Sequence, residues 1–506
     1  MVPPARANIS DIHSKYSAVN SVAIRSLLSK PLRLGSYLAP LLIMAVDYIA
    51  VVMALTVAGY LRTNVIPSLF INLKPFNIGE VYIVYIIPLF YIIFLAFAGM
   101  YSKRLPFWQG TEYLLKISTF VTGLVVIMSY FSGATSNVSR IFILSTWILS
   151  FIFLSVSRYY VKNTLIKCGL WKKTVVMIGD RNHAEILLQS FAHDTHMGYK
   201  IIGLIEDKPE DHNPPCQHFA HLGSFDEIER IILNSAVEDV FITSLGLERK
   251  KLLELFYRVQ PYVRNVYIVP DLLGLPISNI TIEPLVDEKI MLLKIKNNLL
   301  SLPNRIVKRI FDIFLGILLF PTLLPVFLLI ALLIKLDSPG PVLHKAKRIG
   351  KNGREFCCYK FRSMYIDSDI VLEKHLLNDL DAKREWELYA KLKDNDPRVT
   401  KVGRWIRKYS LDELPQIINV ILGDMSLVGP RPYLPREKSS MGSYFGTILE
   451  STPGITGLWQ VSGRNEIMFE GRMILDCWYV RNWSIWLDIV LLCKTVKVVL
   501  GKKGAY

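Results

Sequence analysis

Residues 310–336 read IFDIFLGILLFPTLLPVFLLIALLIKL, an apolar run that would measure about 40 Å as one straight helix. That length is enough to cross the ~30 Å hydrocarbon core of a bilayer. Basic residues flank both ends of the run, however, and the positive-inside rule therefore favours the cytosolic side for both ends. They are Arg305, Lys308 and Arg309 before the run, and Lys335, His344, Lys345, Lys347 and Arg348 at its end and beyond.

Two prolines, Pro321 and Pro325, fall in the middle of this run. Each removes a backbone hydrogen bond and bends a helix. Together with the basic flanks they predict a re-entrant helix over residues 303–336, which dips into one leaflet and returns. A kinked helix that crosses the whole membrane is the alternative.

Four more apolar stretches precede this run, and each is about long enough to cross the membrane as a helix. They are residues 38–60, 80–100, 112–131 and 139–157. Basic residues gather before the first stretch, between the second and third, and after the fourth, where Arg158 and Lys162 lie. Both ends of this module are therefore predicted in the cytosol. Asp47, inside the first stretch, is either a functional charge or a structural partner within the bundle.

Composition agrees with a protein that is part membrane and part cytosol. Hydrophobic residues make up 51% of the 506-residue chain, and the net charge is +16. The basic residues lie beside apolar runs, which suits lipid headgroups and phosphorylated substrates better than nucleic acid. The six cysteines form no CxxC pair and are expected to be free thiols.

From Lys173 onward, short β-rich runs alternate with helical ones, a pattern typical of a parallel, doubly wound domain. The expected strands are Thr174–Ile178, Ile201–Ile205, Val240–Thr243 and Val266–Val269. The first turn contains one glycine, Gly179, where a dinucleotide fingerprint needs three. We therefore expect a Rossmann-like domain without a tight dinucleotide site.

Two adjacent carboxylates, Asp412 and Glu413, follow a basic cluster and precede the amphipathic run Ile417–Leu422. In a phosphate reaction, one such carboxylate attacks phosphorus while its neighbour holds a divalent metal or manages a proton. Ser410 and Glu413 also have the spacing of a capping box, so the acids alternatively begin a helix. A helix start would keep Asp412 ionised. Pro415 complicates that boundary.

Neighbouring segments carry candidate phosphate ligands. Gly429-Pro-Arg431-Pro is a rigid turn whose arginine suits phosphate oxygens. Lys360 and Arg362 alternate with apolar residues, as in a strand with one charged face. In residues 453–465 glycines allow close backbone approach, and Trp459 is a candidate for stacking on a base. The structural alternatives are a solvated turn, a solvent-facing strand and a tight loop around a buried tryptophan.

Taken in order, these segments resemble the catalytic domain of the bacterial sugar transferase family, the monotopic polyprenyl-phosphate phosphoglycosyl transferases. The resemblance covers about residues 303–506, and the preceding spans and Rossmann-like domain are similar to the long members that begin polysaccharide or O-antigen repeat units. Leu324 precedes Pro325 where the family often has serine. The matching motifs are Lys308-Arg309-Ile-Phe-Asp312, Lys360-Phe-Arg362-Ser-Met, Ser410-Leu-Asp-Glu-Leu-Pro-Gln, Gly423-Asp-Met-Ser-Leu-Val-Gly-Pro-Arg-Pro and Pro453-Gly-Ile-Thr-Gly.

The resemblance implies a two-step reaction. Asp412 would attack the sugar-bearing phosphate of a UDP-hexose, expel UMP and hold a phosphosugar-aspartyl intermediate that undecaprenyl phosphate captures. Glu413 would bind Mg²⁺, and galactose is favoured over glucose because the terminal Gly504-Ala-Tyr looks like the galactose subgroup. The implied phosphate-binding residues are Lys360, Arg362, Arg407, Arg431 and Arg464. Gln460, Asp476 and Asp312 also match the motifs, with roles left open.

We therefore expect a multi-domain membrane protein of the bacterial cytoplasmic membrane, with its catalytic domain facing the cytoplasm. Its expected parts are a cytosolic N-terminal segment (1–36), four transmembrane helices (37–160), a Rossmann-like α/β domain (172–275), a linker (276–302), the re-entrant helix (303–336) and a mixed α/β catalytic domain (337–506). Membrane lipid is an expected partner, a homodimer is plausible, and no nucleic acid is expected. Two alternatives remain: a membrane-anchored nucleotide-sugar dehydratase or epimerase, and a non-catalytic scaffold of polysaccharide assembly.

Overall fold

The structure, a computed structural model, divides into two compact units, Met1–Asp271 and Leu272–Tyr506. The described residues are 34–69, 79–131, 139–207, 220–235, 237–243, 247–270, 280–285, 290–379, 383–384, 396–462 and 467–500. The N-terminal segment predicted over residues 1–36 lies almost entirely outside them.

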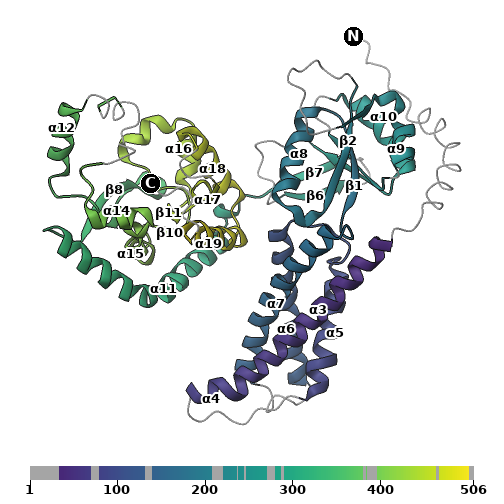
Figure 1. Ribbon diagram of the computed structural model, residues 1–506, viewed down its shortest axis with the longest axis horizontal. Helices are drawn as coiled ribbons and strands as arrows, with labels where there is room; N and C mark the ends of the chain where they lie inside the picture. Colours follow the sequence, from purple (N-terminus) through teal and green to yellow (C-terminus); the bar gives the residue numbers. More distant parts are fainter. Residues whose placement is uncertain are drawn as a thin grey trace. The chain divides into compact units, whose positions relative to one another are not determined.

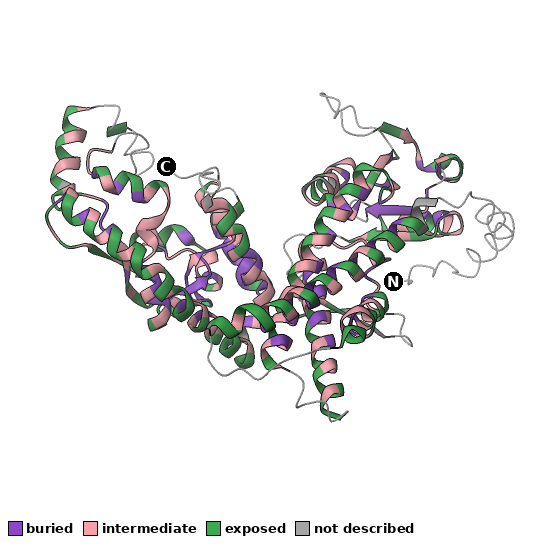
Figure 2. Ribbon diagram, turned by 60° about the horizontal axis from the view of Figure 1, so that its bottom comes forward, coloured by how far each residue is buried: buried purple, intermediate pink, exposed green. Residues whose placement is uncertain are grey.

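Four apolar helices form one bundle in the first unit, as the sequence predicts (Figure 1). They are α3 (Leu34–Tyr60), which continues through a π-helical turn (Leu61–Val65) into α4 (Ile66–Leu69); α5 (Ile87–Phe97), with a π-helical turn (Tyr82–Ile86) before it; α6 (Phe107–Phe131); and α7 (Arg140–Lys167). Three are long and apolar enough to cross a membrane, whereas Tyr82–Phe97 is shorter. Figure 2 shows that their outer sides are largely exposed. Because these exposed side chains are apolar, the bundle presents the surface that lipid contact requires.

An ion pair between α3 and α7 lies inside this bundle. Asp47 is fully buried, and Arg158 is 5% exposed. Arg158 donates through Nη2 to Asp47 Oδ2 at 2.6 Å and through Nε to Oδ1 at 3.0 Å. Arg158, counted among the charges that follow the fourth apolar stretch, is therefore buried within the bundle, because α7 continues to Lys167 and directs Arg158 toward Asp47. Of the two roles left open for Asp47, the structure assigns the structural one.

The α/β domain of the first unit is a five-stranded parallel sheet in the order β3-β2-β1-β4-β5, which is typical of doubly wound nucleotide-binding folds. Its strands are β1 (Lys173–Ile178), β2 (Tyr199–Ile205), β3 (Ala220–Gly223), β4 (Asp239–Thr243) and β5 (Asn265–Val269), with helices α8 (Arg181–His193), α9 (Ile228–Ser235) and α10 (Arg249–Val259). The four predicted strands are confirmed. β3 was missed because its sequence, Ala220-His-Leu-Gly, contains no β-branched or aromatic residue that would mark it as a strand.

The single glycine of the first turn packs against a neighbouring strand. Gly179 has a φ of 126°, and a Cβ there would lie 2.1 Å from Thr243 Oγ1 in β4. The backbone N–H of Asp180 also donates to that oxygen at 3.2 Å. In dinucleotide-binding folds the turn glycines let the pyrophosphate approach the backbone. Here glycine is required by the contact with Thr243.

The second unit is a mixed α/β domain that follows a β-hairpin. The hairpin, β6 (Ile280–Leu285) with β7 (Ile290–Ile295), occupies part of the predicted linker. The other elements are α11 (Leu302–Asp337), β8 (Leu343–Ile349), β9 (Glu355–Phe361), α12 (Ser368–Asn378), α14 (Lys401–Lys408), α15 (Gln416–Leu422), β10 (Ser426–Val428), α16 (Tyr444–Leu449), β11 (Gly454–Thr456), α17 (Leu458–Ser462), α18 (Phe469–Asn482) and α19 (Ile485–Leu500). β8 pairs with β9 antiparallel, and β10 pairs with β11 parallel.

The apolar run with two prolines forms one helix, α11, of 36 residues. Pro321 and Pro325 both lie inside it, and Figure 1 draws the helix bent along its length. Its N-terminal half packs on α15, where Gly316 faces Val420 and Ile421. Near its C-terminal end, Ile330 and Ile334 pack with Phe361 and Ile406. Both ends of α11 therefore contact the same globular domain.

We expect the Asp47–Arg158 pair to stabilise the bundle. Asp47→Ala leaves a buried guanidinium uncompensated, which should cost about 3–5 kcal/mol. Replacing both residues, as Asp47→Leu with Arg158→Met, should restore most of the loss because no charge stays buried. Thermal unfolding of the detergent-solubilised chain measures these changes.

Lys116→Met is the matched control, because Lys116 is exposed and pairs with Glu112 one turn away. Its effect should stay within about 0.5 kcal/mol. A double variant as unstable as Asp47→Ala would contradict this account of the pair.

Candidate active site

The two adjacent acids lie in a tight turn between α14 and α15. Asp412 and Glu413 belong to the 3-10 turn Leu411–Glu413, and Ser410 before it has a φ of 55° with no side-chain capping bond. A non-glycine residue in this region is uncommon and strained. α15 begins only at Gln416. The capping-box alternative is therefore wrong, because the Ser410 side chain makes no capping bond to the short 3-10 turn that follows it.

The carboxyl group of Asp412 has a pKa close to neutral pH. Burial raises its pKa to about 6, and the charge of Glu413 adds to the rise, while Lys360 and Arg407 oppose it. A helix start would have lowered this pKa, whereas at this turn desolvation outweighs any such effect and raises it. Asp412 is still mostly deprotonated at pH 7.

Lys360 is the cation that β9 brings to this turn. Its Nζ lies 2.6 Å from Glu413 Oε1. Burial lowers the pKa of Lys360, but the charges of Glu413 and Asp412 together outweigh that effect and raise it. Lys360 therefore stays charged and offsets the repulsion between the two acids.

Of the two arginines predicted to bind phosphate near the acids, Arg407 acts on Asp412 and Arg362 contacts another part of the domain. Arg407, in α14, donates through Nε to Ser363 Oγ at 2.8 Å, and its charge acts on Asp412. Arg362 instead donates to the carbonyl of Ser338 at 2.6 Å and to that of Pro339, just beyond the end of α11. In the structure Arg362 therefore supports the α11 terminus, and its contact with a phosphate stays a prediction.

The Gly-Pro-Arg turn and the Pro-Gly-Ile-Thr segment are brought together by the β10–β11 pairing. Gly429 N donates to Thr456 O at 2.9 Å, and Gly454 N donates to Pro430 O at 2.8 Å. A Cβ on Gly454 would lie 2.0 Å from the backbone nitrogen of Gly429. Glycine is required here because two backbones touch.

Asp476, whose role the sequence left open, holds the turn that carries Arg431. Its Oδ2 accepts from Tyr433 Oη at 2.9 Å and from Arg431 N at 3.2 Å. Burial raises the pKa of Asp476 to about 7 against the opposing effect of these bonds. The Arg431 guanidinium is held loosely, with Nη2 3.9 Å from Glu437 Oε1. That distance is too long for a hydrogen bond.

Three residues of α11 bind this helix to α15, β10 and α19. Lys308 Nζ contacts Asp488 Oδ2 at 2.8 Å, and Asp312 Oδ1 accepts from Leu427 N at 3.1 Å. Arg309 donates to the carbonyls of Val420 at 2.6 Å and Ile421 at 2.9 Å, near the end of α15. These contacts fix the strand that leads into Arg431.

Arg348, at the end of β8, belongs to the same electrostatic group and was not singled out as a site residue. Its Nε and Nη1 are buried without a hydrogen-bond partner in the described part of the chain. Burial lowers its pKa, and the nearby charge of Arg431 lowers it further, while Glu437 and Glu413 oppose. An oxyanion between Arg348 and Arg431 would satisfy these donors. The sequence could have indicated Arg348, because neighbouring residues of a strand point to opposite faces and Arg348 therefore lies on the other face from the exposed Lys347.

Three residues of the motif over residues 453–465 were candidates for substrate contacts. Trp459 is buried, with the Arg472 guanidinium 4.9 Å from its ring centre, which agrees with the alternative of a buried tryptophan, but it lies in helix α17 and not in a tight loop. Gln460 donates to Ile455 O at 3.3 Å, and its Oε1 has no partner among the described residues. Arg464 lies outside the described residues.

We expect Gly454→Ala to disrupt the turn that carries Arg431. The added methyl would meet the Gly429 backbone, which has no flexible side chain to move, so the loss should be about 1–3 kcal/mol or more. Gly446→Ala is the control, because nothing lies within 4 Å of its Cβ position. Thermal unfolding compares them, and equal stability of the two variants would contradict the contact.

Comparison with known proteins matches both parts of the chain. Residues 303–502 match the family model of the bacterial sugar transferase, and residues 97–270 match a CoA-binding domain. The undecaprenyl-phosphate galactose phosphotransferase of Salmonella typhimurium is 36% identical over 410 residues, 80% of this chain and 84% of that protein. The UDP-galactose-lipid carrier transferase of Erwinia amylovora is 34% identical over 408 residues, 80% and 84%.

The undecaprenyl-phosphate glucose phosphotransferase of Komagataeibacter xylinus is 31% identical over 399 residues, which is 76% of this chain and 69% of that protein. The similarity therefore extends well beyond the domain that carries Asp412. The chain belongs to the bacterial sugar transferase family.

Proposed function

We propose that this enzyme transfers hexose-1-phosphate from a UDP-hexose to undecaprenyl phosphate and releases UMP. The observation that carries the proposal is the half-buried Asp412, which lies between the charges of Lys360 and Arg407 and has a pKa of about 6. Such a carboxylate is ionised at neutral pH and partly stripped of water, which suits a nucleophile. The relatives' names agree with this substrate class.

In the first step a carboxylate oxygen of Asp412 bonds to the phosphorus that carries the sugar. The bond from that phosphorus to the bridging oxygen breaks, and UMP leaves with the electron pair. In the second step a phosphate oxygen of undecaprenyl phosphate attacks the same phosphorus. The aspartyl bond then breaks, Asp412 regains its carboxylate, and the lipid carries the sugar on a diphosphate.

Cations around the turn make such an attack feasible. A carboxylate and a phosphate repel each other unless positive charge lies between them. Lys360 and Arg407 act on Asp412 itself, whereas Arg348 and Arg431 would hold the phosphate oxygens of the donor. The loose ion pair of Arg431 with Glu437 leaves its guanidinium able to turn toward that phosphate.

The donor set also fits Mg²⁺. Carboxylate oxygens on one turn, beside a site for phosphates, are the ligands this ion takes in proteins. Glu413 would hold it, sharing its carboxylate with Lys360. When bound, the ion would polarise a phosphoryl oxygen.

We further propose that α11 is re-entrant, which would bring the lipid carrier to the site from one side of the membrane. A straight helix of 36 residues would be about 54 Å long and would separate its ends by more than a membrane's thickness. Yet Arg309 binds α15, and Asp337 Oδ2 accepts from Val402 N in α14 at 3.0 Å. Both ends held by one domain, with basic flanks, favour the cytosolic face of the cytoplasmic membrane.

The product would be the first lipid-linked sugar of an O-antigen, capsule or exopolysaccharide. Galactose is the favoured sugar, although a relative named for glucose also matches. Tyr389 and Lys393 have the Tyr-xxx-Lys spacing that the dehydratase alternative expects, and they lie outside the described residues.

The direct test is UMP release from UDP-galactose and UDP-glucose by membranes carrying the protein, with undecaprenyl phosphate and Mg²⁺. Asp412→Asn should reduce it at least about 1,000-fold, because a covalent step is lost. Asp367→Asn is the control, since Asp367 is an exposed acid of the same unit. No carrier-dependent UMP from either sugar would overturn the proposal and favour the scaffold alternative.

The pH dependence provides a second test. The rate should rise with pH as Asp412 loses its proton, since only the carboxylate attacks. Lys360 lowers the pKa of Asp412, so Lys360→Met should move this limb to higher pH. Rates at saturating Mg²⁺ measure it, with the exposed Lys347→Met as control. A limb that stays in place in Lys360→Met would argue against Asp412 as the titrating nucleophile.

A further inference from the structure

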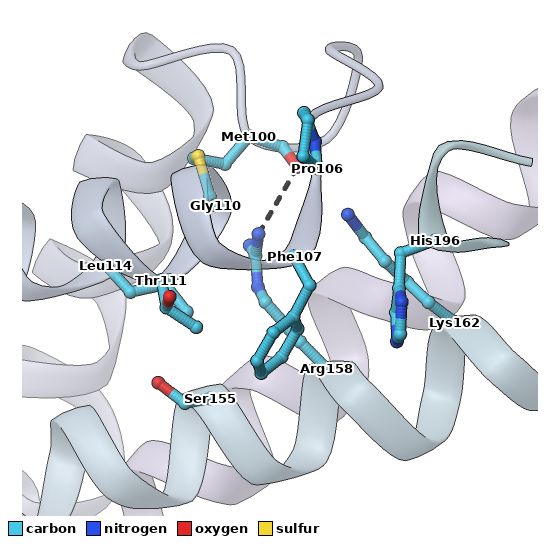
Figure 3. Close-up of a pocket in the computed structure, with 10 residues that line it drawn as sticks. All are labelled: Met100, Pro106, Phe107, Gly110, Thr111, Leu114, Ser155, Arg158, Lys162 and His196. Atoms are coloured by element: carbon cyan, nitrogen blue, oxygen red, sulfur yellow. Dashed lines mark hydrogen bonds between the residues drawn. The ribbon is translucent and has the colours of Figure 1, made fainter. Parts of the chain in front are cut away.

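A cavity lies in the first unit, where the helical bundle meets the α/β domain (Figure 3). Its lining comes from α6, α7, the turn after α5 and the 3-10 turn Thr195–Met197. Its empty space is about 300 Å³ when the open mouth is counted, but only about 20 Å³ of it admits the centre of a water-sized sphere. The cavity therefore has room for a small polar group, and the rest of a larger ligand would lie at its mouth.

Hydrogen bonds between the bundle and the α/β domain build this junction. Phe107 N, at the start of α6, donates to Asp194 Oδ2 at 2.7 Å. Arg104 Nη1 donates to Trp171 O at 2.7 Å and to Met197 O at 2.9 Å. Because these bonds tie the two parts together, the cavity between them has a defined shape.

Two of the three basic side chains in the cavity have acidic partners. Arg158 pairs with Asp47, and it also donates to Met100 O at 3.3 Å, the dashed line of Figure 3. His196 Nδ1 lies 3.3 Å from Asp194 Oδ1. The Nε2 of His196, however, is buried and has no hydrogen-bond partner in the described part of the chain.

Lys162 is the third, and among the described residues no acid forms a direct ion pair with it; the charges of Asp47 and Asp194 act on it only from a longer distance. It is 7% exposed, and within the described residues it makes no hydrogen bond or ion pair. Its ammonium lies 5.4 Å from the centre of the Trp171 ring, a cation–π contact. That contact is weaker than an ion pair and leaves the three N–H donors of the ammonium unused. A buried ammonium of this kind normally has an anion beside it.

We propose that this cavity binds the phosphate of an anionic membrane lipid, with Lys162 as counter-cation and His196 Nε2 as a hydrogen-bond donor. The location favours a lipid over a soluble phosphate. Lys162 follows the apolar part of α7, and the exposed rings of Tyr159 and Tyr160 beside it are typical of a membrane interface. Phe107 and Leu114 provide an apolar wall for the first part of an acyl chain. The site lies outside the domain that carries Asp412 and does not depend on the transferase reaction.

The test is binding of phosphatidylglycerol by the purified, delipidated full chain, measured by native mass spectrometry and by the rise in unfolding temperature. Lys162→Met should bind it about fivefold to tenfold more weakly than wild type. Lys167→Met is the matched control, because Lys167 is exposed on the same helix, and it should bind as wild type does. Phosphatidylethanolamine, which has no net charge, should bind more weakly than phosphatidylglycerol.

Separate arms with inorganic phosphate and coenzyme A distinguish the two sources of phosphate. A response to these alone would assign the cavity to a soluble ligand and overturn the lipid proposal. Equal phosphatidylglycerol binding by Lys162→Met and wild type would overturn it as well.

The unfolding temperature of Lys162→Met without lipid is an independent test. If the ammonium lacks a partner without lipid, Lys162→Met should unfold at the same or a higher temperature than delipidated wild type. A lower unfolding temperature without lipid would mean that the protein itself satisfies Lys162, and the proposal would fail.

Discussion

Lys308 lies where α11, β10, α18 and α19 meet, and the residue is only 6% exposed. It contacts Asp488 Oδ2 at 2.8 Å, Val428 O at 3.0 Å and Tyr479 Oη at 3.3 Å. A buried charge is tolerated only when its partners compensate it, so this position permits few other arrangements of the four elements. Because β10 leads into the Arg431 turn, the same contacts set the position of the candidate phosphate ligands relative to the membrane helix.

The balance of charges is the second constraint on the candidate site. Asp412 and Glu413 repel each other in a partly dry turn, and Lys360 from β9 reduces that repulsion. On the other side, Arg348 and Arg431 carry like charges, and buried nitrogens of Arg348 have no partner among the described residues. The arrangement is acidic where a nucleophile would be and basic where an anionic substrate would be. A phosphate between the two groups would complete the charge balance.

The sequence predicted elements well where the periodicity of apolar residues is strong. The four helices of the bundle, the four longer strands of the parallel sheet and the α11 run all follow from length and pattern. It predicted charged residues less well when their partners are distant in sequence. Arg158 and Asp47 are 111 residues apart, so nothing local distinguishes Arg158 from the flanking charges nearby. Arg362 likewise meets carbonyls 24 residues earlier, at the end of α11.

The sequence by itself determined the family, the three-part organisation and the pair of adjacent acids, because each of these can be recognised from residues that are neighbours in the chain. Only the tertiary structure decided which cations serve the acids, which support the backbone and which have no ion-pair partner within the described parts of the chain. Arg348, Lys162 and Arg362 are the same kind of residue in a sequence, and burial and distance alone separate their roles. That separation depends on packing between segments far apart in the chain, since desolvation and Coulomb forces act through space.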